Sequence, residues 1–195
     1  MPKASLRDAI VDAALVEFHQ HGYAATGVAA ITGSAGAPKG SFYNHFRSKA
    51  DLAMEVADRF AAASPIGVLE DTSVPRAVDR ITGYFDVMLE QLAGIDFRYG
   101  CLLGNLAVDT ATDEPTVAAH VDAVFDAWIA RLATAVRAAQ DQGDVADARD
   151  ADLVAAQLVD LWEGAALRAK ARRDGALTRR VVTDGVRRLL GVPVV

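Results

Sequence analysis

Apolar residues recur at intervals of three and four along nearly the whole chain of 195 residues, and this spacing limits the fold more than any other feature. Such a period places apolar side chains on one face of an α-helix, whereas a half-buried strand needs strict alternation. Alternating runs of β-branched residues are nearly absent, while Ala, Leu and Val are abundant. We therefore expect an all-α protein of about nine helices.

Composition narrows the class of protein. Apolar residues make up 52% of the chain and charged residues 24%, which is typical of a folded protein with a core and excludes a disordered one. The single cysteine, Cys101, excludes an intramolecular disulfide and a four-cysteine zinc site. No window reaches about 18 uninterrupted apolar residues, and the first turns of the chain carry charges throughout. The sequence thus predicts a cytoplasmic protein without a membrane span or a secretion signal.

Turn and capping signals divide the beginning of the chain into short helices. The first is expected to begin after Ser5 and to end at Gly22. Two shorter helices, over 28–34 and 39–45, are separated by the residues Ala-Gly-Ala-Pro at 35–38, where Gly permits a left-handed turn and Pro favours a new helix start. This spacing indicates a helix-turn-helix.

Longer helices are expected in the remainder. Ser48 caps a fourth helix that reaches about Ala63, and residues 64–74 lose the period and contain Pro and Gly. Five more helices are predicted, at about 75–93, 98–108, 114–141, 150–173 and 178–190. The domain boundary lies in 64–74 or slightly earlier, within the fourth helix. We divide the chain into a helix-turn-helix domain, 1–48, and a second helical domain, 49–195.

Charge differs between the two ends of the chain. The net charge is −6, yet residues 1–49 hold five Lys and Arg against three Asp and Glu, so the remainder carries −8. Polyanions are attracted to the first part and repelled by the second. Contact with nucleic acid is therefore expected only in the basic head.

The second helix of a helix-turn-helix enters the DNA major groove, which is wide enough to admit it. Phe42 and Phe46 are four residues apart and should face a small core. The outward side chains can meet base edges and phosphates: Lys39, Ser41, Tyr43, Asn44 and His45. Gly40 lies where helices cross closely, and Thr26 and Lys49 begin the flanking helices, where phosphate oxygens are favoured. The alternative for each polar residue is that it merely solvates an exposed helix.

The stretch from Thr26 to Leu52, TGVAAITGSAGAPKGSFYNHFRSKADL, closely resembles the DNA-binding head of the TetR family of transcriptional repressors, and residues 10–23 are similar to it too. The resemblance implies that Thr26 touches phosphate and caps the second helix, that Lys39, Ser41 and Asn44 read bases, and that Tyr43, His45 and Lys49 hold the DNA backbone. Ala29 and Ala30 stand where many relatives have longer polar side chains, so base reading would rest more on the third helix.

The resemblance also implies a symmetric homodimer that represses transcription, binds a palindromic double-stranded DNA operator and is released by a small-molecule inducer. In such a protein 1–48 would be the DNA-binding domain and 49–195 the ligand-binding and dimerisation domain. We assign no cofactor and expect no contact with a membrane. Half-sites about one helical turn apart require two heads held at a matching distance. We expect the last two long helices to form the dimer through their apolar faces: Leu153, Ala156, Leu161, Gly164, Ala165, Val181, Val182, Gly185, Val186 and Leu189. The alternative is that these faces are buried in the chain's own core.

The ligand pocket is predicted from residue types, because pockets are mostly apolar and aromatic with a few polar groups. The candidates are Phe60, Tyr84, Phe85, Met88, Cys101, Asn105, Phe125, Trp128 and Trp162. Residues of these types at helical spacing more often belong to a core.

The segment from Tyr99 to Leu106 resembles the Gly-Cys-x-x-Gly-Asn segment of a TetR subgroup that includes repressors responsive to reactive electrophiles and small unsaturated acids. Cys101 lies near a predicted helix start with Arg98 close in sequence, an environment that can activate a thiol. The interpretation we favour is a small buried hydrophobe. An electrophile- or redox-sensing repressor acting through Cys101, or an activator with the same fold, remains the alternative function.

An enzyme is the rival class, and the sequence argues against it. Nucleophilic catalysis needs a base and an orienting partner, and metal-dependent hydrolysis needs several ligands at suitable spacing. His19 and His21 diverge on a helix and His120 stands alone, so we assign neither catalytic residues nor a metal site. The basic cluster from Arg168 to Arg188 has two interpretations: a second DNA surface or, the one the sequence favours, solvated faces and charges at helix C-termini.

Overall fold

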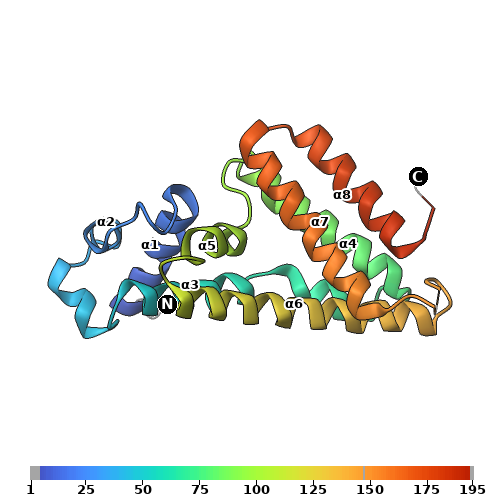
Figure 1. Cartoon of the computed structure of the whole chain (residues 1–195), viewed down its shortest axis with the longest axis horizontal. Helices are drawn as coiled ribbons and strands as arrows, with labels where there is room; N and C mark the ends of the chain where they lie inside the picture. Colours follow the sequence, from blue (N-terminus) through green and yellow to red (C-terminus); the bar gives the residue numbers. More distant parts are fainter. Residues whose placement is uncertain (1–4, 147, 194–195) are drawn as a thin grey trace. The chain divides into compact units, whose positions relative to one another are not determined.

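The structure is a computed structural model that describes residues 5–146 and 148–193. Within these ranges every regular element is a helix, which confirms the predicted all-α class (Figure 1). The elements are α1 (Leu6–His21), α2 (Val28–Ser34), η1 (Lys39–Asn44), α3 (Lys49–Ala62), η2 (Pro65–Glu70), α4 (Ala77–Gly94), α5 (Leu102–Thr110), α6 (Pro115–Asp141), α7 (Ala151–Arg172) and α8 (Gly175–Leu190), where η marks a 3-10 helix. Among the described helices, none is long and apolar enough to cross a membrane.

The chain forms two compact units. Unit 1 contains the chain up to Ala63 together with Cys101–Val124, and unit 2 contains Ser64–Gly100 and Phe125–Val195. The helix-turn-helix therefore shares a unit with α3, α5 and the first turns of α6. The rest of α6 belongs to unit 2.

Unit 1 is built around α1, which packs on α2, α3 and α5. Its core is a set of fully buried side chains: Ile10, Val11, Ala14, Phe18, Ile31, Phe42, Leu52 and Val56. The two predicted caps are present, because Ser5 accepts a hydrogen bond from the amide of Asp8 at 3.1 Å and Ser48 accepts one from the amide of Asp51 at 3.0 Å. Each cap satisfies an amide that the first turn leaves without a helical partner.

Gly22 ends α1 in a conformation that favours glycine, with φ at +85°. A Cβ atom built on it would lie 2.8 Å from Oδ2 of Asp109 on α5. The absence of a side chain at this position therefore allows the end of α1 to approach α5 closely.

The segment expected to be an α-helix over 39–45 is a 3-10 helix, η1. The amide of Ser41 donates to the carbonyl of Pro38 at 2.9 Å and that of His45 to the carbonyl of Phe42 at 2.9 Å, both three residues back. Six residues that include Gly40 are too few and too poor in helix propensity for a stable α-helical nucleus, so the tighter turn forms instead.

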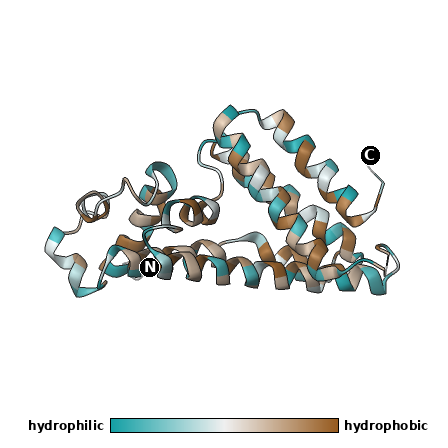
Figure 2. Ribbon diagram, in the orientation of Figure 1, coloured by the Kyte–Doolittle hydropathy of each residue, from teal (hydrophilic) through white to brown (hydrophobic). Residues whose placement is uncertain are grey.

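Unit 2 consists of α4 packed on η2 and on α8, and of α7 packed on α8. Figure 2 shows apolar and polar residues alternating around these helices, as amphipathic packing requires. Gly185 on α8 lets the two last helices approach, because its Cβ would lie 2.6 Å from Cδ2 of Leu161 on α7. The last helix begins at Gly175, three residues before the predicted start, because Asp174 caps it by accepting from the amide of Leu177 at 3.0 Å.

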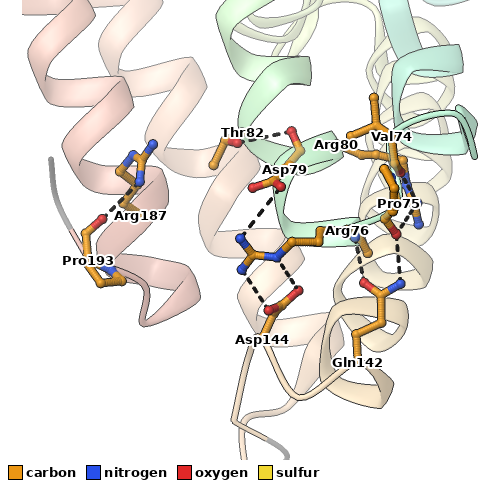
Figure 3. A network of polar contacts seen from close by, with 11 residues as sticks. Val74, Pro75, Arg76, Asp79, Arg80, Thr82, Gln142, Asp144, Arg187 and Pro193 are labelled. Carbon is orange, nitrogen blue, oxygen red and sulfur yellow. Dashed lines mark hydrogen bonds and ion pairs between the residues drawn. The ribbon is translucent and has the colours of Figure 1, made fainter.

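Polar contacts fix the start of α4 to the end of α6 (Figure 3). The amide of Ala77 donates to Oε1 of Gln142 at 2.7 Å, and Nε2 of Gln142 donates to the carbonyl of Pro75 at 3.0 Å. Arg76 forms an ion pair with Asp144 at 2.7 Å. The hydrogen bond from Arg76 lowers the pKa of the Asp144 carboxyl below its ordinary value.

Candidate nucleic-acid interface

The short helix η1 has one buried and one exposed side. Phe42 and Phe46 are 0% and 2% exposed, and their ring centroids lie 5.6 Å apart. Tyr43 is 65% exposed, with its ring held edge-on against Phe42 at 5.2 Å. The two aromatic anchors therefore set which side chains of η1 face outward.

The exposed side carries the polar residues predicted from the sequence. Lys39, Gly40 and Asn44 are exposed, and Ser41 and His45 are half-buried. The Ser41 hydroxyl donates to the carbonyl of Pro38 at 2.6 Å, which secures the first turn of η1. Four of the η1 candidates are thus exposed, and two are partly covered by their neighbours.

Thr26 and Lys49 lie elsewhere and have partners within unit 1. Thr26 is 3% exposed, and its hydroxyl donates to the carbonyl of Gly22 at 2.7 Å. The expectation that Thr26 caps the second helix is wrong, because the N-cap of α2 is Gly27 and no side chain caps it. The ammonium of Lys49 donates to the carbonyls of Tyr23 and Thr26 at 3.0 and 3.2 Å and lies 4.1 Å from the centroid of the Tyr23 ring. Both side chains hold the segment between α1 and α2 in this structure.

Tyr23 is the centre of a polar network that the sequence analysis did not find. Its amide donates to Oδ2 of Asp109 at 2.7 Å, and its hydroxyl donates to Oε1 of Glu114 at 2.8 Å. Burial of the phenol, followed by the Glu114 carboxylate, holds the pKa of Tyr23 well above its ordinary value. Together with Lys49, these contacts define the Tyr23 network. No local signal predicts it, because its partners are 86 and 91 residues away along the chain.

Six of the nine ligand candidates lie in unit 2: Tyr84, Phe85 and Met88 on α4, Phe125 and Trp128 on α6, and Trp162 on α7. The rings of the aromatic members follow one another at centroid distances of 6.3 Å (Phe125 to Trp128), 6.5 Å (Trp128 to Tyr84), 5.2 Å (Tyr84 to Phe85) and 6.4 Å (Phe85 to Trp162). We call these five rings the aromatic cluster.

The aromatic cluster contains polar atoms as well. The hydroxyls of Ser64 and Tyr84 lie 3.3 Å apart, and Ser64 was not among the sequence candidates. Within the described part of the chain, Nε1 of Trp128 and of Trp162 is buried without a hydrogen-bond partner. A buried donor without an acceptor costs about 1–3 kcal/mol, so a ligand oxygen or a water would satisfy it favourably.

The other three ligand candidates lie in unit 1. Phe60 contacts the His19 ring at 5.9 Å, Cys101 is the N-cap of α5 and is 7% exposed, and Asn105 is on the same helix. The nine candidates are therefore divided between the two units.

The predicted dimer faces are divided by the fold. Val182 and Val186 of α8 and Ala165 of α7 are buried within the chain, because α8 packs on α7 and α4. On the outer side of α7, Leu153 is 57% exposed and Leu167 is 62% exposed, with Gly164 exposed between them. Burial in the chain's own core, the alternative from the sequence, thus holds for part of the set.

Comparisons with known proteins agree with this architecture. Residues 10–56 match the family described as "Bacterial regulatory proteins, tetR family", and residues 77–184 match "Tetracyclin repressor-like, C-terminal domain". The chain is 33% identical to the HTH-type transcriptional repressor DhaR of Mycobacterium sp. (strain GP1), over 89% of this chain and 87% of that protein. It is 34% identical to the transcriptional regulator AcuR of Cereibacter sphaeroides, over 87% of this chain and 78% of that protein.

Solved structures show the same similarity. A regulatory protein TetR from Rhodobacter sphaeroides is 30% identical, with a TM-score of 0.82 that covers 94% of this chain and 96% of that one. The reduced form of Escherichia coli NemR is 25% identical, with a TM-score of 0.83 over 98% and 100% of the two chains. The predicted resemblance is confirmed: this chain belongs to the TetR family of bacterial transcriptional regulators.

Proposed function

We propose that the protein is a ligand-responsive transcriptional repressor that binds a palindromic operator as a homodimer and is released by a small molecule. The observation that carries this proposal is the two-sided η1, with Phe42 and Phe46 buried and a row of polar side chains outside. Two buried rings restrain the exposed side chains, and restrained donors and acceptors are what base reading needs. We keep 1–48 as the reading head and 49–195 as the body that responds. Such a regulator acts where the chromosome lies, in the cytoplasm.

Within the head, we assign base reading to Lys39, Ser41 and Asn44, and contact with the DNA backbone to Tyr43 and His45. A Cβ built on Gly40 would meet no atom within 4 Å, so the expected close helix crossing at this position is wrong. The open space would instead let a sugar-phosphate strand come close. Thr26 and Lys49 are proposed to act through the backbone between α1 and α2, because their polar atoms already hold its carbonyls. A direct phosphate contact by Lys49 would require those bonds to be exchanged.

For the homodimer, we propose the outer side of α7 as the contact, with the adjoining side of α8. Exposed Leu153 and Leu167 lie on one side of α7, and Gly164 between them allows a second helix to approach. A two-fold axis would place the same surface of a second copy against it, which covers both leucines at once.

For the inducer, we propose the aromatic cluster of unit 2 as the binding site. The five rings would provide apolar contact, and the indole donors of Trp128 and Trp162 would provide the few polar groups a pocket uses for orientation. Release from DNA requires that the inducer bind the non-DNA-binding state more tightly than the DNA-binding state.

A second candidate function is an electrophile- or redox-sensing repressor that acts through Cys101. The observation that favours it is the place of Cys101 as N-cap of the nine-residue helix α5, where amide groups favour a thiolate. Escherichia coli NemR, to which this chain is similar, is described in its reduced form. In this case, Cys101→Ser would keep operator binding and lose release by an alkylating compound.

The proposal is tested by fluorescence anisotropy with the DNA that flanks the protein's own gene and with a random duplex of equal length, each at two salt concentrations. Saturable binding that prefers the flanking DNA, with an even number of protomers per duplex, is the expected result. Asn44→Ala should reduce that preference by about 1–3 kcal/mol, whereas Tyr43→Ala should weaken binding to both duplexes. Equal loss on both duplexes for every head variant would contradict the assigned roles.

A further inference from the structure

Arginine side chains in this protein are divided into a paired and an unpaired group. Ten of the sixteen contact carboxylates or donate to backbone carbonyls: Arg7, Arg59, Arg76, Arg80, Arg98, Arg131, Arg137, Arg149, Arg179 and Arg187. Among the described residues, the other six have no such partner: Arg47, Arg168, Arg172, Arg173, Arg180 and Arg188. All six are exposed. Five of them lie between residues 168 and 188.

Four of these arginines lie around the connection between α7 and α8. Arg168 and Arg172 are four residues apart on α7 and so share one side of that helix. Arg173 follows as the C-cap, and Arg180 lies in the second turn of α8, which packs on α7. We call Arg168, Arg172, Arg173 and Arg180 the basic turn.

The charge of this region opposes that of the chain. Residues 164–190 hold eight Lys and Arg against two Asp, although the whole chain carries −6. The first 49 residues hold only five against three. The basic turn is therefore a stronger attractor of polyanions than the head by charge alone.

Charges that merely stabilise helix ends account for only part of this cluster. Arg172 lies in the last turn of α7, where a cation interacts favourably with the helix dipole. Arg180 is nearer the N-terminal end of α8, where the dipole disfavours a cation. The interpretation as solvated faces rested on Asp174 and Asp184, which are close to these arginines in the sequence. In the structure, Asp174 caps α8. Among the described residues, no ion pair joins either aspartate to the basic turn.

Arg173 also occupies a position that usually holds glycine or asparagine. Its φ and ψ are +52° and 36°, the left-handed conformation that closes many helices. A side chain raises the energy of this conformation, and glycine does not. Arg173 therefore closes α7 less favourably than glycine would.

We propose that the basic turn contacts the phosphate backbone of duplex DNA as a second surface, separate from η1. The inference rests on the proposed function. Phosphate is the partner that fits, because guanidinium groups pair with phosphate oxygens through two parallel hydrogen bonds, and four unpaired guanidinium groups repel one another until an anion joins them. In a homodimer the surface is present twice, so the number of phosphates that it can neutralise is doubled.

The test measures how the affinity for DNA depends on salt concentration. The probe is a random duplex, so that base reading does not contribute to the affinity. The variant carries Arg168→Gln, Arg172→Gln and Arg180→Gln. Its matched control carries Arg98→Gln, Arg131→Gln and Arg137→Gln, which removes the same charge from unit 2 at exposed positions that are already paired. The slope of log K against log salt concentration should become shallower by about 0.9 for each phosphate that the variant no longer neutralises, and should stay at the parent value in the control.

A single substitution separates binding from folding. Arg173→Gly should leave the melting temperature unchanged or raise it, because glycine suits the left-handed cap, and should still weaken binding to the random duplex. Equal slopes for the parent, the triple variant and the control would overturn the inference. So would a slope that changes equally in variant and control, since that reports net charge alone.

The outcomes also separate this inference from the proposed function. A parent protein that binds no duplex, flanking or random, overturns the proposed function. If the parent binds DNA, if Tyr43→Ala abolishes this binding and if the triple variant leaves it unchanged, only the role of the basic turn is overturned. Binding of the parent, but not of the triple variant, to phosphatidylserine vesicles with unchanged DNA slopes would assign the surface to a membrane and likewise overturn it.

Discussion

The two compact units are stabilised by different kinds of buried contact. In unit 1, the Tyr23 network joins side chains from α3, α5 and the start of α6 to the segment between α1 and α2 through directional bonds of 2.7 to 3.2 Å. In unit 2, the aromatic cluster is held by ring contacts and leaves two indole donors without partners among the described residues. Directional bonds specify one geometry, whereas buried donors without partners favour the entry of a group that can accept from them. Unit 1 is thus suited to present η1 rigidly and unit 2 to accept a ligand.

Tyr84→Ala tests the aromatic cluster with the largest expected effect. Tyr84 is fully buried and contacts both Phe85 and Trp128, so truncation should cost about 3–5 kcal/mol of unfolding free energy. Urea denaturation followed by circular dichroism measures it. Val87→Ala, at a 38% exposed position on the same helix, is the control and should change the stability far less. A similar cost for both would show that the rings are not the main packing of unit 2.

Tyr23→Phe tests the network of unit 1 with an intermediate effect. The change keeps the ring beneath Lys49 and removes the donor to Glu114, which leaves a part-buried carboxylate without that bond. We expect a loss of about 1–2 kcal/mol in urea denaturation. Tyr43→Phe alters a phenol on the exposed side of η1 and should leave the stability unchanged. Equal stability of the two variants would mean that this hydrogen bond of the network does not contribute to the free energy of unfolding.

Ser64→Ala removes the corresponding polar contact of unit 2. The hydroxyls of Ser64 and Tyr84 are 3.3 Å apart, a long distance for an O–H donor, so the loss should be about 0.5 kcal/mol. Thermal unfolding of the variant beside Tyr23→Phe measures the difference. A larger loss for Ser64→Ala than for Tyr23→Phe would reverse the contrast between the units.

The smallest effect is expected from pH. The Arg76 hydrogen bond lowers the pKa of Asp144 in the folded protein, so its contribution is present above the pKa of the unfolded chain and is lost as the pH falls through the lowered folded value. Arg76→Gln should therefore make the melting temperature fall slightly less between neutral pH and about pH 3. The pair is exposed, so the difference should be small. An identical fall in melting temperature in both proteins would show that this pair does not contribute to the stability.

Local signals in the sequence predicted most of the fold. The hydroxyls of Ser5 and Ser48 cap their helices as their positions indicated, and η1 exposes the polar side chains that its spacing set opposite Phe42 and Phe46. The 3-10 form of η1 was missed, because residue spacing over six positions does not distinguish the two helix types.

Long-range contacts could not be predicted in the same way. Lys49 donates to the carbonyls of Tyr23 and Thr26, contacts that no periodicity can reveal, and its contact with phosphate stays a prediction. The ligand candidates were chosen by residue type, and type alone did not separate Phe60, Cys101 and Asn105 in unit 1 from the aromatic cluster in unit 2. Single-sequence patterns report helix faces, but not which faces meet.

The placement of the indole side chains has a practical consequence. Both tryptophans of the chain, Trp128 and Trp162, belong to the aromatic cluster, whereas the head contains none. Intrinsic emission excited at the red edge of the absorption band therefore reports on unit 2 alone, without a label. A compound that enters the cluster should alter that emission in the absence of DNA, so inducers can be screened before any operator is known.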